Sequence, residues 1–316
     1  MRRLIFIIPV LFLCVGMAPL SFRDRQLNYT RVRMAYACKE KKVVKNLTDH
    51  SIVRDNLRIY LRAFKEEKII EIWARNATDT VFIPVQEIPI CDISGDVGPK
   101  RRSHDMQVPE GFYRIIDLNP YSKYFLSIQI NYPNASDSIR GTRGRLGNEI
   151  FIHGDCISSG CMAITDDKIQ ELFVYCIEAY NSGQKNIEMA IYPERLTDSN
   201  YARLTTRYSK YKDEMSLWAD LKKSYDLFDT YKMPPSVKFL ANGTHEVNPP
   251  LRRSPSENLE LLQQKTPIVE LSNQLSGHEA HLFKTITTPF CLQQNLMAEK
   301  KLHLFRKEKS MNQQMN

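Results

Sequence analysis

Apolar and polar residues alternate over several short stretches in the first two thirds of the chain. Residues 57–64 alternate in this way, residues 65–68 form a charged turn, and residues 69–74 return to an apolar, β-prone pattern. A period of two is typical of a strand with one buried face, so this pattern predicts a β-hairpin. Further strands are predicted at residues 81–83, 87–91, 112–117, 124–131, 150–152 and 186–192. Many short strands separated by Gly, Pro and Asn favour a mainly β fold of the sandwich or mixed-barrel type.

Two other regions have the helical period. The first begins at Thr165, which is a good N-cap followed by two aspartates, and ends at Gly183. Its apolar residues recur every three or four positions, and Cys176 falls among them, so Cys176 is predicted to be core. The second region, residues 198–250, is predicted to be a helical extension that packs on the sheet.

The remaining segments show neither pattern. Residues 1–22 contain two arginines, an apolar run too short for an ordinary membrane span, and then small residues, which predicts a signal peptide or an N-terminal anchor. Residues 23–55 are basic without clear periodicity and are predicted to be a spacer or a peripheral helix. Residues 251–316 are rich in Gln, Asn, Ser and Lys and are predicted to be a polar, flexible tail.

Composition narrows the class of protein. The 316 residues are 42% hydrophobic and 10% aromatic, which is enough for a substantial folded core. A formal charge of +8 favours anionic surroundings such as a polyanionic cell envelope or a membrane surface. The sequence has no pattern typical of a nucleic-acid-binding motif, so nucleic acid is not a predicted partner.

The clearest chemistry lies between Glu149 and Thr165. Here a short strand runs into a Gly- and Ser-rich loop that holds His153 and, eight residues later, Cys161. An imidazole beside a thiol is the minimal pair for acyl transfer, because the imidazole can take the thiol proton as the sulfur attacks a carbonyl. Gly160 lets a substrate approach the backbone, so the N–H groups of residues 160 and 161 are the predicted oxyanion hole.

The same residues allow other interpretations. Cys156 and Cys161 can form a small structural disulfide, with His153 merely at the surface. The spacing His-x2-Cys-x4-Cys also allows a metal site, although no fourth ligand is evident. A thiol-disulfide module is a third alternative, but the cysteines are not spaced as CxxC. We predict no metal and no cofactor.

Three ordered segments resemble one known family. His153-Gly154 followed by Ser158-Ser159-Gly160-Cys161 is similar to the active-site signature of the YkuD-type L,D-transpeptidase catalytic domain, in its YafK-like branch. The other two segments run from Gly98 to Tyr113 and from Ile130 to Asn134. The resemblance implies a catalytic domain over residues 56–197, and a weaker similarity continues through Trp218 and Pro234-Pro235.

The resemblance also implies roles for the site residues. Cys161 would be the nucleophile and His153 the general base, with Ser159 and Gly160 in the backbone that binds the oxyanion and with Gly154 and Ser158 nearby. Ser159 stands where the family often has His, and Ala163 where it has Arg or Asn.

The implied protein is an exported transferase of the bacterial periplasm or cell envelope. It would act on peptidoglycan stem peptides through a Cys161 thioester, which an amine or water then resolves. The YafK-like branch is associated with hydrolytic release of wall-attached protein or peptide, so net hydrolysis is an alternative. A wall-binding module without activity is a further one.

Two predictions concern the surroundings of this pair. Arg101 and Arg102 lie in the loop from Ser94 to Glu110 and either bind substrate carboxylates or form a solvated surface, on which His104 is predicted to lie. Cys156 is predicted to pair with Cys161 under oxidising conditions, in which case a reductant should raise activity.

Overall fold

The structure is a computed structural model that describes residues 20–147 and 149–251. Most of the predicted signal segment 1–22, and all but the first residue of the predicted tail 251–316, therefore lie outside the described residues.

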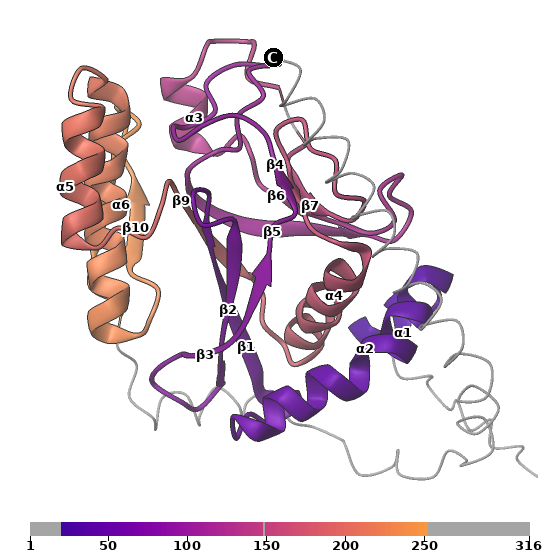
Figure 1. The fold of residues 1–316 in the computed structure, drawn as a ribbon. Coiled ribbons are helices and arrows are strands. Elements are labelled where there is room, and N and C mark those ends of the chain that lie inside the picture. The colour runs from indigo at the N-terminus through magenta and orange to yellow at the C-terminus, as the bar shows by residue number, and fades with distance from the viewer. Residues whose placement is uncertain (1–19, 148, 252–316) are drawn as a thin grey trace, which may run out of the picture.

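A nine-stranded mixed sheet forms the centre of the molecule, with strands in the order β3-β2-β1-β9-β5-β6-β7-β8-β4. Figure 1 shows the sheet to be strongly curled, with helix α4 against its inner side. The strands are β1 (Leu57–Phe64), β2 (Ile69–Asn76), β3 (Ile83–Pro89), β4 (Asp92–Ile93), β5 (Gly111–Asn119), β6 (Ser127–Ile130), β7 (Phe151–His153), β8 (Met162–Ala163) and β9 (Glu188–Tyr192). The prediction of a mainly β fold with helices is confirmed in this form.

The predicted hairpin is confirmed as β1 and β2, which pair antiparallel from Leu57↔Asn76 to Phe64↔Ile69. Other boundaries differ from the prediction. β3 begins only at Ile83, and β6 begins at Ser127 rather than at Tyr124. The last difference arises because Phe125 has a φ of +72°, a left-handed backbone conformation that a strand does not contain.

One face of the sheet is covered by the N-terminal helices and by α4. They are α1 (Phe22–Gln26), α2 (Thr30–Asp49), the short 3-10 helix η1 (Arg54–Asn56) and α4 (Asp166–Asn181). α4 begins at the predicted N-cap, where the Thr165 side chain accepts a hydrogen bond from the Lys168 N–H, and it buries Cys176 as predicted. α2 packs on α4 and buries Val32, Val43 and Leu47 in the main core, so residues 23–55 are part of the folded core and not a spacer.

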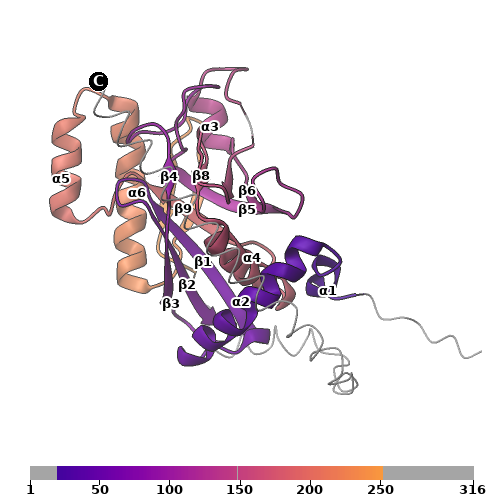
Figure 2. The same cartoon turned by 45° about the vertical axis from the view of Figure 1, so that its right-hand side comes forward.

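The other face is covered by the predicted C-terminal helices, as Figures 1 and 2 show. These are α5 (Asp198–Arg207) and α6 (Lys212–Tyr231), followed by the hairpin of β10 (Ser236–Phe239) and β11 (His245–Asn248), while α3 (Ala135–Arg140) lies near one end of the sheet. α6 buries aromatic side chains around Arg62 of β1, whose guanidinium lies 4.7 Å from the ring centres of both Tyr225 and Phe228. The two faces of β1 thus belong to two separate cores.

Within the described part of the chain, no helix is long and apolar enough to cross a membrane.

Candidate active site

The sheet brings His153 and Cys161 together. His153 ends β7 and Cys161 directly precedes β8, and these parallel strands are aligned so that Ile152 faces Met162. Ile152 and Met162 point into the core, and side chains alternate along a strand, so His153 and Cys161 share the opposite face. The predicted pair therefore occupies diagonal positions on adjacent strands.

The protonation state of His153 follows from its contacts. Its Nδ1 lies 2.6 Å from the Gly154 carbonyl oxygen, which can only accept a hydrogen bond, so Nδ1 carries the proton and Nε2 carries the lone pair. The ring stacks on Tyr124, with ring centres 4.4 Å apart. Burial lowers the pKa of His153, so the imidazole is neutral and Nε2 can accept a proton at neutral pH.

The Cys161 thiol is free and half-buried. Burial raises its pKa, while a backbone hydrogen bond with Phe151 and the charges of Lys100 and Lys123 act in the opposite direction with smaller effect. The site at rest is therefore a neutral thiol beside a neutral imidazole, not a preformed ion pair. Such a pair needs its proton transferred during attack on the substrate.

Cys156 does not pair with Cys161, so that prediction is wrong. It forms a disulfide with Cys91, with Cα atoms 5.5 Å apart, and so ties the nucleophile loop to the residue before β4. The sequence gives no sign of this pairing, because 65 positions separate the two cysteines. The disulfide also removes Cys156 from the alternative metal site. No group of three His, Cys, Asp or Glu side chains that could hold a metal ion occurs in residues 20–147 and 149–251.

Side chains at and after β4 hold the loop before the nucleophile. Asp92 accepts a hydrogen bond from the Ser158 N–H at 2.9 Å, and the Ser94 hydroxyl accepts one from the Gly160 N–H at 2.6 Å. Ser158 also donates its hydroxyl proton to the Cys161 carbonyl at 2.5 Å, while Ser159 is exposed. The Gly160 amide predicted for the oxyanion hole is thus occupied by Ser94 in this state. Gly160 has a φ of +109°, which favours glycine.

Gly154 is required by close packing on the His153 side. A Cβ atom there would lie 2.4 Å from Asp166 Oδ1 and 2.8 Å from the Tyr124 carbonyl oxygen. The same Asp166 oxygen accepts a hydrogen bond from the Asp155 N–H at 2.9 Å. The first turn of α4 therefore fixes the loop that follows His153.

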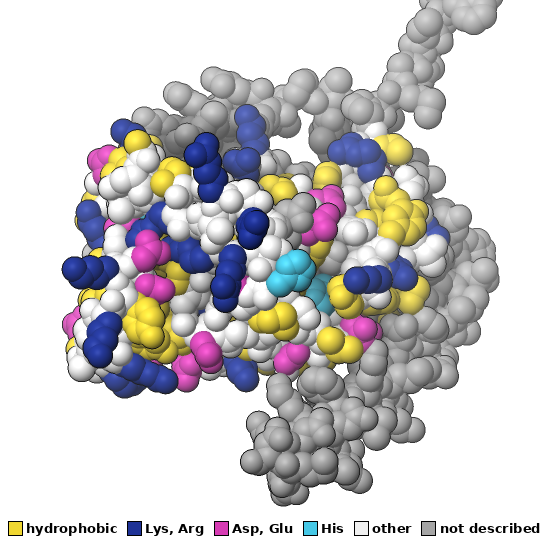
Figure 3. All heavy atoms as spheres, turned by 90° about the horizontal axis from the view of Figure 1, so that it is seen from above, with side chains coloured by type: hydrophobic (Ala, Val, Ile, Leu, Met, Phe, Trp, Pro, Cys, Tyr) yellow, Lys and Arg dark blue, Asp and Glu magenta, His cyan; other side chains and the backbone are white. Residues whose placement is uncertain are grey.

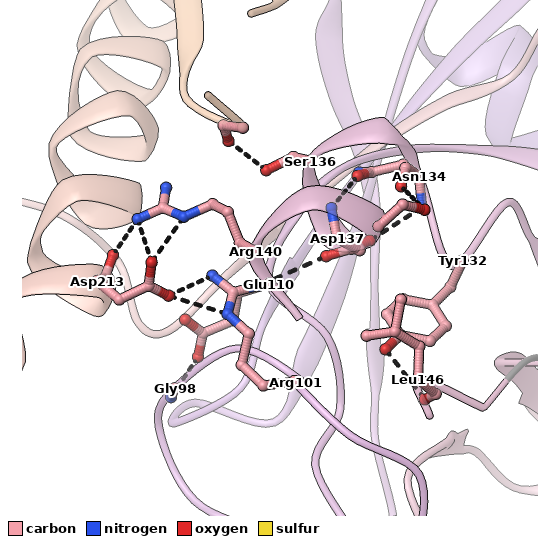
Figure 4. Close-up of polar contacts among 12 residues, drawn as sticks. Gly98, Arg101, Glu110, Tyr132, Asn134, Ser136, Asp137, Arg140, Leu146 and Asp213 are labelled. Atoms are coloured by element: carbon pink, nitrogen blue, oxygen red, sulfur yellow. Dashed lines mark hydrogen bonds and ion pairs between the residues drawn. The ribbon is translucent and has the colours of Figure 1, made fainter. Parts of the chain in front are cut away.

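Arg101 is engaged with the C-terminal helices and does not stand free for substrate (Figure 4). Its Nε donates to Asp213 of α6 at 2.9 Å, and Arg140 of α3 binds the same aspartate with Nε at 2.7 Å. The Arg102 side chain is exposed, and so is His104, as predicted. Of the two arginines, only Arg102 fits the predicted role of meeting a substrate carboxylate from solvent.

The loop that carries these arginines ends at a buried carboxylate, Glu110. Glu110 accepts hydrogen bonds from the Gly98 N–H and from Trp218 Nε1 of α6, both at 2.7 Å. Within the same loop, Asp105 accepts a hydrogen bond of 2.6 Å from the Lys100 ammonium. The sequence contained a signal for Glu110 and Trp218, since both fall in the segments that resemble the family, but it did not show that they meet.

Figure 3 shows His side chains near the middle of the face seen from above, with Lys and Arg side chains on either side and Asp, Glu and hydrophobic side chains between them.

Comparison with known proteins defines the class. Residues 78–180, which contain both His153 and Cys161, match the profile of the YkuD family, described as the L,D-transpeptidase catalytic domain. The chain is also 37% identical over 195 residues to the protein named "Putative L,D-transpeptidase YafK" of Escherichia coli strain K12, an alignment that covers 61% of this chain and 75% of that protein. The chain is therefore an L,D-transpeptidase-type enzyme by class. It belongs to the family of the YkuD catalytic domain.

Solved structures with a similar arrangement are more distant. The helical cell shape determining protein Pgp2 from Campylobacter jejuni is 20% identical, with a TM-score of 0.36 over 59% of this chain and 74% of that one. Bd1075 from Bdellovibrio bacteriovorus is 21% identical, with a TM-score of 0.33 over 54% of this chain and 62% of that one. At these TM-scores the similarity supports no further conclusion about the present chain.

Proposed function

We propose that this chain is an exported cysteine acyl-transferase that acts on peptidoglycan stem peptides, with Cys161 as nucleophile and His153 as general base. The observation that carries the proposal is a neutral imidazole, with its Nδ1 proton donated to the Gly154 carbonyl, diagonal to a half-buried neutral thiol directly before the neighbouring strand. Membership of the L,D-transpeptidase family supports the stem peptide as substrate.

In the first step the Cys161 sulfur attacks the carbonyl carbon of a stem-peptide amide while His153 Nε2 takes the thiol proton. The carbonyl oxygen becomes an oxyanion as the carbon–sulfur bond forms. The carbon–nitrogen bond then breaks, and His153 returns the proton to the leaving amine. A thioester on Cys161 and a neutral imidazole remain.

The oxyanion would take the position of the Ser94 hydroxyl. That hydroxyl accepts from the Gly160 N–H and donates its own proton to the Met106 carbonyl at 2.8 Å. Ser94 would therefore occupy the hole between turnovers and move aside when the developing negative charge offers Gly160 and Cys161 a stronger acceptor.

In the second step an amine or water attacks the thioester carbonyl while His153 takes a proton from it. The carbon–sulfur bond then breaks, and His153 returns the proton to the Cys161 sulfur. An amine gives a new cross-link and water gives a trimmed stem. Ala163 and Ser159 offer no charged group to hold an amine, and a weakly held amine competes with water at roughly 55 M unless binding supplies a high effective concentration. We therefore favour a hydrolytic outcome, which includes release of wall-attached peptide or protein.

The proposal divides the chain by role. Residues 1–22 direct export to the periplasm or cell envelope, residues 56–197 carry the catalysis, residues 198–250 support it, and no chemistry is assigned to residues 251–316. The rival thiol-disulfide function, which would use Cys156 with Cys161, is disfavoured because Cys156 is bonded to Cys91.

The test is incubation of the purified protein with a tetrapeptide-stem muropeptide and an excess of a labelled D-amino acid, followed by mass spectrometry. Mostly trimmed tripeptide is expected. Dominant label incorporation or a cross-linked dimer would assign net transpeptidation instead. Unchanged muropeptide with the wild type, or equal product with Cys161→Ala, would reject the proposed activity.

A further inference from the structure

A second pocket lies between the sheet and the hairpin β10–β11, with a volume of about 200 Å³. The residues that line it include none from the Cys161 site. Its floor is formed by strands β1, β9 and β5 and by Asn131 after β6, and its far wall by Pro234, Pro235 and Phe239. Ligand pockets of this kind combine apolar walls with a few polar groups, and this pocket has both.

The floor carries an acidic and a basic side chain next to each other. Tyr60 of β1, Glu188 of β9 and Arg114 of β5 follow one another across three paired strands. Directly opposed residues in a sheet have Cβ atoms about 5 Å apart on the same face. Among the described residues, however, neither the Glu188 carboxylate nor the Arg114 guanidinium has a hydrogen-bond or ion-pair partner, so the two charged groups are separated from each other.

The apolar walls are held in place without a ligand. The rings of Phe112 and Phe239 both meet His245 edge-on, each with ring centres 5.0 Å apart. Asp220 fixes that histidine by accepting from Nδ1 at 3.0 Å. A preformed pocket loses less ordering entropy when it binds a ligand, so its aromatic walls favour binding.

The charged side chains and aromatic rings that line the pocket indicate which chemical groups a ligand would carry. A carboxylate next to aromatic rings attracts an ammonium group, and a guanidinium attracts a carboxylate. Asn131 adds donors beside Arg114, because its Oδ1 accepts from the Arg114 backbone N–H at 2.7 Å and its NH2 group remains.

We propose that this pocket binds the zwitterionic head of an α-amino acid, with the ammonium on Glu188 and the carboxylate on Arg114. An α-amino acid places these opposite charges on one carbon, which suits two charged side chains that are neighbours but not bonded. Partial desolvation at the pocket floor raises the pKa of Glu188, and an ammonium ligand would reverse that effect by favouring the ionised carboxylate. If the proposed hydrolysis of stem peptides holds, the amino acid that it releases has this head group.

The test is calorimetric titration of the full chain carrying Cys161→Ala with D-alanine and L-alanine. Using this variant makes the result independent of the proposed catalysis. We expect binding, and at least about tenfold weaker binding of N-acetyl-alanine, which lacks the ammonium, and of alanine amide, which lacks the carboxylate. Glu188→Gln and Arg114→Gln should weaken alanine binding by a similar factor, whereas Glu246→Gln, at a carboxylate on β11 that is likewise exposed but does not line the pocket, should not change it.

Three results would overturn this proposal. One is no binding of either alanine at about 10 mM, ten times a millimolar dissociation constant. Another is tight binding of N-acetylglucosamine without binding of alanine, which would make the pocket a sugar site. The third is equal loss with Glu188→Gln and Glu246→Gln at unchanged melting temperature.

Discussion

The helical layers on the two faces of the sheet support different halves of the active site. On the N-terminal side, Arg31 of α2 donates to the carbonyl oxygens of Ser122 and Phe125 at 2.5 and 2.6 Å. These residues flank Tyr124 in the sequence, and the Tyr124 ring stacks on His153. The same layer contacts α4, whose Asp166 fixes the loop after His153. The N-terminal layer therefore positions the base.

The C-terminal layer acts on the nucleophile side. Trp218 and Asp213 of α6 bind Glu110 and Arg101, which lie in or beside the loop that follows Ser94. In that loop the Met106 carbonyl accepts a hydrogen bond from the Ser94 hydroxyl, and the same hydroxyl accepts one from the Gly160 N–H next to Cys161. Residues of α2 and α6 thus connect to separate halves of the proposed His153–Cys161 pair.

The two halves are joined at the Cys91–Cys156 disulfide, where we expect the largest effect. Replacing both cysteines by serine should lower the free energy of unfolding by up to about 4 kcal/mol, because the bond closes a long loop of the unfolded chain. It should also slow acylation of Cys161, because the nucleophile loop loses its tie to β4. Urea unfolding and single-turnover acylation would measure the two effects.

For the same reason a reductant should lower wild-type activity, which reverses the expectation from the sequence. The double-serine variant with reductant is the control, because Cys38 is also disulfide-bonded and its contribution must be measured separately. Higher wild-type activity with reductant would contradict the assigned role of this bond.

The next largest effect should come from Glu178 on the N-terminal side. This buried carboxylate binds Arg54 with two hydrogen bonds of 2.7 Å, Tyr36 at 2.6 Å, and Arg23. Glu178→Ala removes the buried partner of two partly buried cations, which keep only the more exposed Glu40 and Asp55, and should cost about 3 kcal/mol in urea unfolding.

Glu40→Ala is the matched control, since Glu40 is an exposed partner of the same Arg54 and should cost less than about 1 kcal/mol. Equal costs for the two variants would mean that α2 is not anchored through Glu178.

A smaller effect should distinguish a hydrogen bond that the C-terminal layer makes to the loop beside Cys161 from an equivalent one elsewhere in the fold. Trp218→Phe removes a hydrogen bond to buried Glu110, and Trp73→Phe removes one to Glu71, each of 2.7 Å. Both should cost about 2 kcal/mol, the value of a hydrogen bond to a charged group. Only Trp218→Phe should slow alkylation or acylation of Cys161, because only Trp218 contacts the loop beside the nucleophile. Equal changes in thiol reactivity would remove the distinction between the two sites.

The smallest effect concerns pH. Burial lowers the pKa of His153, so the acylation rate should fall with decreasing pH at a midpoint below the ordinary histidine value of about 6.5. The unfolded chain binds this proton before the folded chain does. The contribution of His153 to stability is therefore fully present above the unfolded pKa and decreases as the pH falls below it. A midpoint above 6.5 in a pH-rate profile would mean that His153 is not held neutral by burial.

The comparison of the two layers also shows which helix the sequence pattern could predict and which it could not. The buried face of α6 has the apolar residues Leu217, Trp218, Leu221, Tyr225 and Phe228 and, as its polar member, only the small Ser224, and the apolar spacing predicts the helix. The buried face of α2 has the same spacing but includes Lys39 among Val32, Tyr36, Val43 and Leu47. Lys39 is buried because it pairs with Asp167 of α4, a contact that no local pattern reveals.

The same limit applies to the site. The residues His153, Gly154, Gly160 and Cys161 are close in sequence, and the structure brings the strands that carry them together. Ser94, Tyr124 and Cys91 reach the site through strand pairing and chain reversal, so their contacts depend on tertiary structure. The sequence around Arg101 predicts either a substrate contact or a solvated surface, whereas its ion pair with Asp213 joins residues more than a hundred positions apart.

The central claim is that Cys161 carries the acyl group, and mapping a covalent adduct tests it most directly. A carbapenem is a strained cyclic amide that a nucleophilic thiol opens to a stable acyl-enzyme. After incubation and proteolysis, mass spectrometry should locate the adduct on the peptide that contains Cys161, and His153→Ala should slow its formation by about 10² to 10⁴. An adduct that persists in Cys161→Ala, or that forms at the wild-type rate in His153→Ala, would contradict the account.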